Sequence, residues 1–249
     1  MSAARTGLLG KKLGMTQVFT PNGDLVAVTA VHAGANVVIG KRTKEKDGYS
    51  AIRLGYDERP LRTTNKPELG VFSKASLAPQ RFVKEVRVAD GDLDKYEVGK
   101  PVGIDVVFKK GTYVDVVGTS KGKGYQGVMK RHHMPGFRST HGTHEFFRHG
   151  GSIGCRLTPG RVHRGKRMSG HMGDVQRTIQ NLPIVDLLVE ENVLLLGGPV
   201  PGGKNGYLVI KNATKKTGAV KVRGAGEVQE KSKNPMKASK AAAAAAKKK

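Results

Sequence analysis

The sequence is poor in cysteine, tryptophan and long apolar runs. Cys155 is the one cysteine among 249 residues, tryptophan is absent, and aromatic residues make up 5% of the chain. A single cysteine excludes an intrachain disulfide and is compatible with a reducing compartment. No stretch approaches the roughly twenty apolar residues of a membrane-spanning helix, and no long apolar segment lies near the N-terminus. We therefore expect a soluble, cytoplasmic protein.

Acidic residues are also scarce, and the excess of cations is unevenly distributed. The chain has 44 Lys and Arg residues against 20 Asp and Glu, a net charge of +24. Residues 121–173 hold eleven cations and one acid, Glu145, while residues 211–249 hold twelve cations and two acids. Each segment thus carries +10, and all other residues together carry +4. A nearly neutral body with two basic segments is typical of nucleic-acid binding, because bound cations release counterions from phosphates.

An anionic membrane surface is the alternative partner for such charge. An interfacial helix needs a face of Leu, Phe or Trp beside its cations. Neither basic segment has one. The pattern therefore favours nucleic acid and indicates no membrane contact.

The body of the chain has the pattern of a mainly β protein, with 37% apolar residues to build a core. Short runs rich in β-branched residues, separated by turn residues, are typical of a sandwich or barrel. The predicted strands are 15–19, 25–31, 36–42, 49–55, 82–88, 101–108, 113–117, 175–180, 184–189, 193–196 and 207–210. Pro21 to Asp24 and Glu190 to Asn192 are predicted hairpin turns. One short helix is expected at 67–75, within a proline-interrupted stretch.

The basic segment between two of these strands is predicted to be a long excursion from the β body. Twelve glycines and the absence of aliphatic runs leave residues 121–173 too little apolar surface to offset the entropy of ordering. A partner must therefore impose its structure. Beyond residue 213 the chain loses its pattern and ends in an Ala/Lys-rich run, which predicts a disordered tail over 214–249.

A dinucleotide-binding motif is present in form but lacks its context. Gly122-Lys-Gly-Tyr-Gln-Gly127 matches G-x-G-x-x-G after a predicted strand, and Glu145 follows at a suitable distance. However, Pro135 and Gly136 stop any helix within a few residues, and no parallel strand leads to Glu145. We interpret these glycines instead as points where the backbone approaches a phosphate closely. We predict no cofactor and no small-molecule substrate.

Histidines in the same segment suggest metal or nucleophile chemistry, and neither pattern is complete. His144 and His149 resemble the zinc motif H-E-x-x-H, but the second histidine comes one residue late, which on a helix rotates it about 100° away. A loop zinc site including His141 remains an alternative. Cys155 has histidines nearby, but no residue is evidently placed to orient a base. We therefore predict no metal and no enzyme activity.

The arginines and lysines of the segment are interleaved with Phe137, Phe146, Phe147 and histidines. Guanidinium planes and aromatic rings together suit structured RNA, where phosphates and unstacked bases are both available. The candidate RNA-binding residues are Lys11, Lys12, Lys121, Lys123, Lys130, Arg131, Arg138, Arg148, Arg156, Arg161, Arg164, Lys166, Arg167 and His171.

Several separate motifs resemble large-subunit ribosomal protein L-three of the bacterial type, in the order that this family has them, from about Gly7 to Ala213. They are Gly7-Leu-Leu-Gly-Lys-Lys-Leu-Gly-Met-Thr-Gln-Val-Phe19, Thr119-Ser-Lys-Gly-Lys-Gly-Tyr-Gln-Gly127, Gly151-Ser-Ile-Gly154, Thr158-Pro-Gly160, Gly165-Lys-Arg-Met-Ser-Gly-His-Met-Gly173 and Gly197-Gly-Pro-Val-Pro-Gly202. The resemblance implies a translation-protein-type β-barrel over 1–213, with a small inserted lobe at about 59–97 and an RNA-penetrating extension at 118–174.

The resemblance also implies a function and partners. A member of this family binds large-subunit rRNA near its 3′ end, nucleates early assembly, and touches the fourteenth and nineteenth large-subunit proteins. It implies a stem that binds RNA through Lys121, Lys123, Lys166, Arg167 and His171. The part nearest the peptidyl transferase centre is implied to be Gly151, Ser152, Ile153, Gly154, Cys155, Arg156, Leu157, Thr158, Pro159 and Gly160. A free-standing RNA chaperone or regulator is the alternative function.

One departure from the family pattern concerns Arg156 and Leu157. Many bacterial relatives have Asn-Gln there, with the glutamine methylated on its amide. Leucine has no amide nitrogen, so we expect that modification to be absent. We hypothesise that the cation at Arg156 replaces the contact of the polar pair.

Overall fold

The computed structural model describes residues 6–20, 23–216 and 218. The tail predicted for 214–249 lies outside these residues, except for 214–216 and 218. None of the helices in the described ranges is long and apolar enough to cross a membrane.

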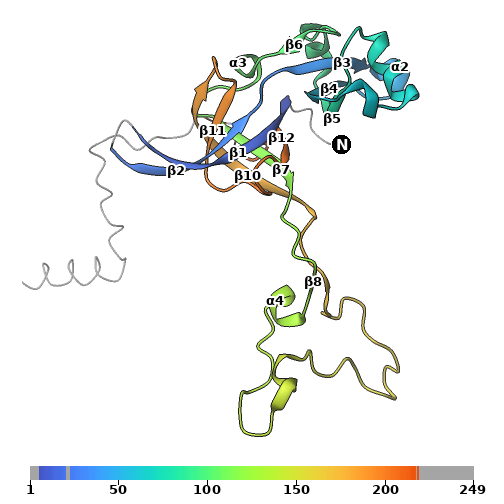
Figure 1. The fold of residues 1–249 in the computed structure, drawn as a ribbon, viewed down its shortest axis with the longest axis vertical. Coiled ribbons are helices and arrows are strands. Elements are labelled where there is room, and N and C mark those ends of the chain that lie inside the picture. The colour runs from blue at the N-terminus through green and yellow to red at the C-terminus, as the bar shows by residue number, and fades with distance from the viewer. Residues whose placement is uncertain (1–5, 21–22, 217, 219–249) are drawn as a thin grey trace, which may run out of the picture.

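Six antiparallel strands close into a barrel in the order β1-β12-β7-β10-β11-β2 (Figure 1). They are β1 (Gly7–Phe19), β2 (Leu25–His32), β7 (Tyr113–Thr119), β10 (Gln176–Leu188), β11 (Val193–Gly197) and β12 (Tyr207–Asn212). The predicted mainly β class is confirmed. β1 begins earlier than the predicted start at Met15, because Leu8 and Leu9 are fully buried in the barrel core. The predicted strands 175–180 and 184–189 form one strand, with a register shift between Ile179 and Leu182.

A four-stranded sheet in the order β5-β4-β3-β6 lies beside the barrel (Figure 1). Its strands are β3 (Asn36–Arg42), β4 (Ala51–Glu58), β5 (Gln80–Arg87) and β6 (Pro101–Val102). The helices around it are α1 (Lys44–Asp47), η1 (Leu61–Thr63), α2 (Lys66–Lys74), η2 (Asp90–Lys95) and α3 (Ile104–Val107). α2 confirms the predicted helix. This sheet spans 36–102, so the predicted lobe at about 59–97 covers only part of it, and the domain division stays a prediction.

The strand predicted at 101–108 is wrong beyond Val102. The chain turns at Gly103 into α3, a single helical turn. Ile104 and Phe108 are both almost fully buried, at 0% and 1% exposure. Because they are four residues apart, both side chains point to the core from one side of a helical turn. On a strand, the side chain of Val106, midway between them, would also point to the core. Val106 is instead 68% exposed.

One apolar core runs continuously from the barrel into the second sheet. Asn36 marks the junction, with a side chain that is completely buried. Its amide oxygen accepts a hydrogen bond from the Leu9 N–H at 2.9 Å, and its amide nitrogen donates to the carbonyl oxygens of Leu9 and Ala33, each at 2.9 Å. Two of these bonds fix the start of β3 to β1, and the third fixes it to the connection after β2.

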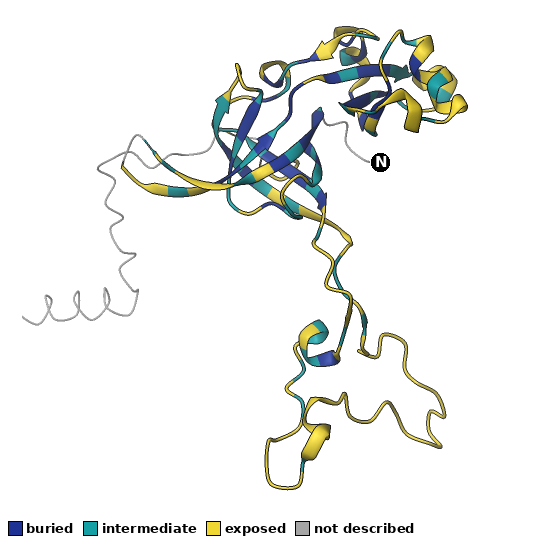
Figure 2. Ribbon diagram, in the orientation of Figure 1, coloured by how far each residue is buried: buried dark blue, intermediate teal, exposed yellow. Residues whose placement is uncertain are grey.

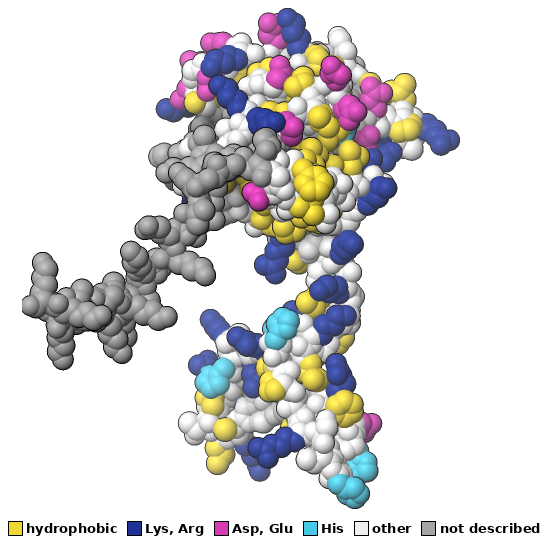
Figure 3. Space-filling view, turned by 90° about the vertical axis from the view of Figure 1, so that its left-hand side faces the viewer, with side chains coloured by type: hydrophobic (Ala, Val, Ile, Leu, Met, Phe, Trp, Pro, Cys, Tyr) yellow, Lys and Arg dark blue, Asp and Glu magenta, His cyan; other side chains and the backbone are white. Residues whose placement is uncertain are grey.

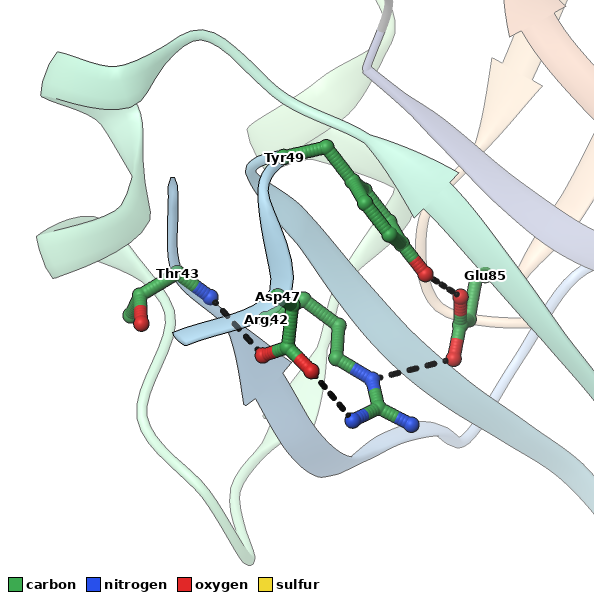
Figure 4. A network of polar contacts seen from close by, with 5 residues as sticks. All are labelled: Arg42, Thr43, Asp47, Tyr49 and Glu85. Carbon is green, nitrogen blue, oxygen red and sulfur yellow. Dashed lines mark hydrogen bonds and ion pairs between the residues drawn. The ribbon is translucent and has the colours of Figure 1, made fainter. Parts of the chain in front are cut away.

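A polar network stabilises the outer end of the second sheet (Figure 4). The Arg42 guanidinium donates to Asp47 at 2.7 Å and to Glu85 at 3.3 Å. The Tyr49 hydroxyl donates to the other Glu85 oxygen at 2.7 Å. The bond to Glu85 is the main reason that the pKa of Tyr49 is raised. Arg42 and the two carboxylates thus have partners within the protein.

The outer half of the β1–β2 hairpin has exposed apolar side chains but no cations. Phe19 and Leu25 are paired across the hairpin and are 73% and 54% exposed, and Met15 is 55% exposed. Residues 13–40 contain no lysine or arginine. This surface therefore lacks the charge expected of an rRNA contact.

Candidate nucleic-acid interface

The basic segment begins where β7 and β10 leave the barrel together and extends as a long arm (Figures 1 and 2). Pairing of the two strands continues past the barrel, from Thr119 opposite Gln176 to a bond from the Ser120 N–H to the Val175 oxygen at 3.0 Å. Farther out, the Lys123 N–H donates to the Met172 oxygen and the Met172 N–H to the Gly124 oxygen, each at 2.9 Å. A two-stranded stem therefore joins the arm to the barrel.

The stem ends in a short sheet of β8 (Tyr125–Gln126) and β9 (Gly170–His171). Position 173, on the barrel side of this sheet, requires glycine. Its φ is +78°, and a Cβ there would collide with the Lys121 carbonyl oxygen. The close approach of a phosphate to the glycines of Gly122 to Gly127 stays a prediction. Gly173 makes a different close approach, between the two stem strands, a long-range contact that no local motif reveals.

Beyond the stem lies helix α4 (Val128–His132), which ends before Pro135 as expected. The Arg131 guanidinium donates to the Met168 carbonyl oxygen at 2.7 Å, and the His132 ring lies 3.0 Å from the same oxygen. Arg131 is half-buried as a result. This predicted RNA-binding cation thus also fastens the outgoing chain to the returning chain.

A second contact organises the far end of the arm. The Phe137 N–H donates to the Phe147 carbonyl oxygen at 3.0 Å, which connects the loop after α4 to the 3-10 helix η3 (His144–Arg148). His149 follows η3, and its ring packs edge-on against Phe146 with centroids 4.8 Å apart. Almost every residue from Phe137 to Ser169 is exposed. The arm therefore has local contacts but no apolar core.

Most of the predicted RNA-binding side chains lie exposed along this arm. Figure 3 shows Lys, Arg and His side chains gathered on the arm, and acids gathered over the body. The exposed members are Lys121, Lys123, Lys130, Arg138, Arg148, Arg156, Arg161, Arg164, Lys166, Arg167 and His171. Among the described residues, none of the eleven cations of 121–173 forms an ion pair with a carboxylate. Their charge is thus uncompensated within the described protein.

Lys11 and Lys12 lie on the barrel and already have partners there. Lys11 lies 3.8 Å from the Asp57 carboxylate and over the Tyr207 ring. Lys12 is only 9% exposed, and its ammonium donates to the carbonyl oxygens of Val200 and Gly202 at 2.8 and 3.3 Å. Burial, followed by the charge of Lys121, lowers the pKa of Lys12. The ammonium group of Lys12 thus has partners within the protein, and its contact with RNA stays a prediction.

The segment Gly151–Gly160 forms part of the arm's distal loop and is exposed at every residue. At its start, Gly151 and Ser152 line an open cavity of the distal arm, whereas Leu157 is 88% exposed. Cys155 is a free, exposed thiol. Over the described residues, no three His, Cys, Asp or Glu side chains are grouped closely enough to hold a metal ion, so His141, His144 and His149 are not brought together as ligands.

Comparison with known proteins identifies the family. Residues 80–192 match the family model described as ribosomal protein L3. A large ribosomal subunit protein uL3 from Sorangium cellulosum is 48% identical over 212 residues, which cover 85% of this chain and 91% of that protein. The chain belongs to the ribosomal protein L3 family. The uL3 of Fusobacterium nucleatum is 52% identical and that of Bacillus cereus 49%, each over 211 residues covering 85% of this chain and 98% of the relative.

Proteins of the L3 family are structural components of the large ribosomal subunit and not enzymes, and in bacteria that subunit lies in the cytoplasm. Membership explains why the enzyme-like motifs of the arm are incomplete. It also agrees with an arm that presents exposed cations along its length.

Proposed function

We propose that this chain binds large-subunit rRNA directly through its arm, and that the barrel and second sheet serve to hold the root of that arm. The uncompensated charge of the arm carries the proposal. Eleven exposed or half-buried cations share one acid, Glu145, without an ion pair among the described residues. Such charge repels itself unless a polyanion is bound, and phosphates of structured RNA are the matching partner.

Salt dependence of rRNA binding tests this proposal. Replacing Lys166 and Arg167 by glutamine should lower the slope of log affinity against log salt by about 1.5, because each lost phosphate contact removes roughly 0.7 to 0.9. A matched control replaces Lys95 and Lys100, which already pair with Asp92 and Glu97 at 2.6 and 2.7 Å. The control removes the same net charge and should leave the slope nearly unchanged. Equal slopes for both double variants would contradict an interface on the arm.

The alternative of a free-standing RNA chaperone or regulator predicts a different distribution in the cell. A ribosomal protein sediments with the large subunit at physiological magnesium, whereas a free-standing regulator stays in the light fractions. We expect the tagged full-length chain in the large-subunit fraction. Its absence from that fraction would contradict the ribosomal function itself.

We further propose that Gly151 to Gly160 lies near the peptidyl transferase centre. Cys155 offers a direct test, because it is the chain's one cysteine and is exposed. An iron chelate attached to Cys155 in reconstituted subunits releases hydroxyl radicals that cut nearby rRNA. We expect cleavage within the peptidyl transferase region and none with Cys155→Ser. Cleavage confined to other regions would overturn this location.

We further propose that the chain binds early near the 3′ end of the rRNA and nucleates assembly. It contacts the fourteenth and nineteenth large-subunit proteins. The exposed apolar side chains of Phe19 and Leu25 support the proposal of protein neighbours, because this hairpin has no cations to contact rRNA. A photo-crosslinking amino acid at position 19 should join to one of those two proteins.

Omitting the chain from stepwise reconstitution should arrest an early intermediate, and an intermediate that matures normally would contradict nucleation.

A further inference from the structure

The distal part of the arm has an open cavity that the proposed interface leaves unexplained. It measures about 550 Å³ and lies between the start of α4 and the end of η3. Val128, which is 7% exposed, contributes an apolar wall. Phe137, Phe146 and Arg148 line it together with His149. A volume of this size is in the range of small-ligand sites.

The two phenylalanine rings of the cavity are presented to solvent but held by their backbones. Phe137 is 53% exposed and Phe146 58%. The bond from the Phe137 N–H to the Phe147 oxygen fixes the two loops that carry them. Gly136 permits this approach, because its φ is +76° and a Cβ there would collide with the same Phe147 oxygen. His149 packs edge-on against Phe146 at 4.8 Å.

The polar groups around the cavity select the kind of ligand. Arg148 is exposed and, within the described part of the chain, pairs with no carboxylate. The Ser169 hydroxyl is engaged with the Tyr125 hydroxyl at 2.6 Å, and Ser152 is engaged with the backbone of Gly154. Aromatic faces beside one free guanidinium match a flat, uncharged ring system that carries a phosphate.

We propose that this cavity binds one unstacked nucleotide of single-stranded RNA, with its base against Phe146 and Phe137 and its phosphate on Arg148. The inference rests on the proposed rRNA binding and specifies one subsite of it. An apolar protein segment would also cover the two rings, but it would bury Arg148 without an anion, which is costly. The acid-poor surroundings therefore favour RNA over a protein segment.

Neighbouring phenylalanines allow a matched test. Phe146 lines the cavity, whereas Phe147 is adjacent in sequence, is 40% exposed, and does not line it. The probe is a ten-nucleotide single-stranded RNA of uridines with one central 2-aminopurine, titrated with the full-length protein. Stacking of the purine on an aromatic ring quenches its fluorescence. Phe146→Leu and Phe137→Leu should abolish the quenching and weaken binding roughly 5- to 100-fold, while Phe147→Leu should match the parent.

Salt dependence distinguishes this subsite from general RNA binding. The Phe146→Leu variant removes no cation, so its salt slope should equal that of the parent, whereas Arg148→Gln should lower the slope by about one and retain the quenching. Equal affinities of the Phe146→Leu and Phe147→Leu variants, or binding without quenching, would overturn the nucleotide site and leave the rRNA proposal standing. Absence of salt-dependent binding by the parent would contradict both.

The same variants can be compared inside assembled large subunits. Reagents that acylate the ribose 2′-hydroxyl react with conformationally free nucleotides of all four bases. We expect at least one rRNA nucleotide to become reactive in subunits with Phe146→Leu but to stay unreactive in subunits with Phe147→Leu. Identical reactivities of all nucleotides near the arm would overturn the proposal for the assembled particle.

Discussion

The ammonium group of Lys12 donates a hydrogen bond of 2.8 Å to the carbonyl oxygen of Val200. This contact joins β1 to the loop that precedes β12, far along the chain. Lys12 thus makes a contact within the protein close to the root of the arm, and its pKa is lowered by burial and then by the charge of Lys121. Neighbouring lysines on one strand thus have different roles.

Replacing Lys12 by methionine should destabilise the protein by about 1–3 kcal/mol, because the carbonyl groups of Val200 and Gly202 lose their shared donor. Lys11→Met is the control and should change stability by less than about 1 kcal/mol, as expected of a partly exposed ion pair. Urea unfolding of the purified chains measures both. Equal unfolding midpoints for the two variants would show that the buried contact adds nothing.

Asn36 should be among the most sensitive polar positions. Replacing it by alanine leaves the Leu9 N–H and two carbonyl groups without partners in a buried place, and we expect a loss of about 2–4 kcal/mol. Asn212→Ala, which removes a single half-buried bond to Thr6 at 2.7 Å, should cost about 1 kcal/mol or less. A loss at Asn36 no greater than that at Asn212, by the same urea measurement, would contradict a role in fixing β3 to β1.

Gly173→Ala should separate the two strands of the stem. The added methyl collides with the Lys121 carbonyl oxygen and also requires a strained positive φ. Gly165→Ala shares the positive φ, at +79°, but its Cβ meets no atom within 4 Å. We expect faster hydrogen exchange at the Lys123 and Met172 amides in the Gly173 variant only. Similar exchange in both variants would contradict a role of the collision with Lys121 in the stem.

Tyr56 should make stability fall at alkaline pH. Its side chain is 4% exposed, and burial, with smaller effects of Asp57 and Tyr207, raises its pKa to about 12. An unfolded tyrosine releases its proton near pH 10, so between about pH 10 and 12 the unfolded state binds fewer protons than the folded state. The parent should therefore lose about 2 kcal/mol more than Tyr56→Phe across this range. Urea titrations at several pH values measure this, and parallel curves would contradict it.

Local sequence signals predicted much of the barrel correctly. The hairpin turn at Glu190 to Asn192 is confirmed, since Leu188 pairs with Val193 in β10 and β11. Its polar turn between two aliphatic runs is a short-range pattern that needs no distant partner. The strand predicted at 101–108 failed because Ile104 and Phe108 suit both a strand and a helical turn. Only the position of the core decided between them.

The candidate site was predictable as a charged segment but not as an arrangement. Charge counting identified candidate cations of which most lie exposed, with Lys11, Lys12 and Arg131 as the exceptions. It did not separate Lys12 from Lys11, because strand alternation shows that neighbours face opposite sides but not which side is buried. Nor did it show that Phe146 lines the cavity and Phe147 does not. That difference depends on the bond between Phe137 and Phe147.

The sequence by itself determined the mainly β class, the excess of cations in residues 121–173, and the motifs shared with the L3 family. These depend on composition and on spacing over a few residues. Only the tertiary structure decided which strands close the barrel, that Gly173 meets Lys121 in the stem, and that the rings of Phe137 and Phe146 share a cavity. Such contacts join residues far apart in the chain, and their geometry is set by the packing of the whole fold.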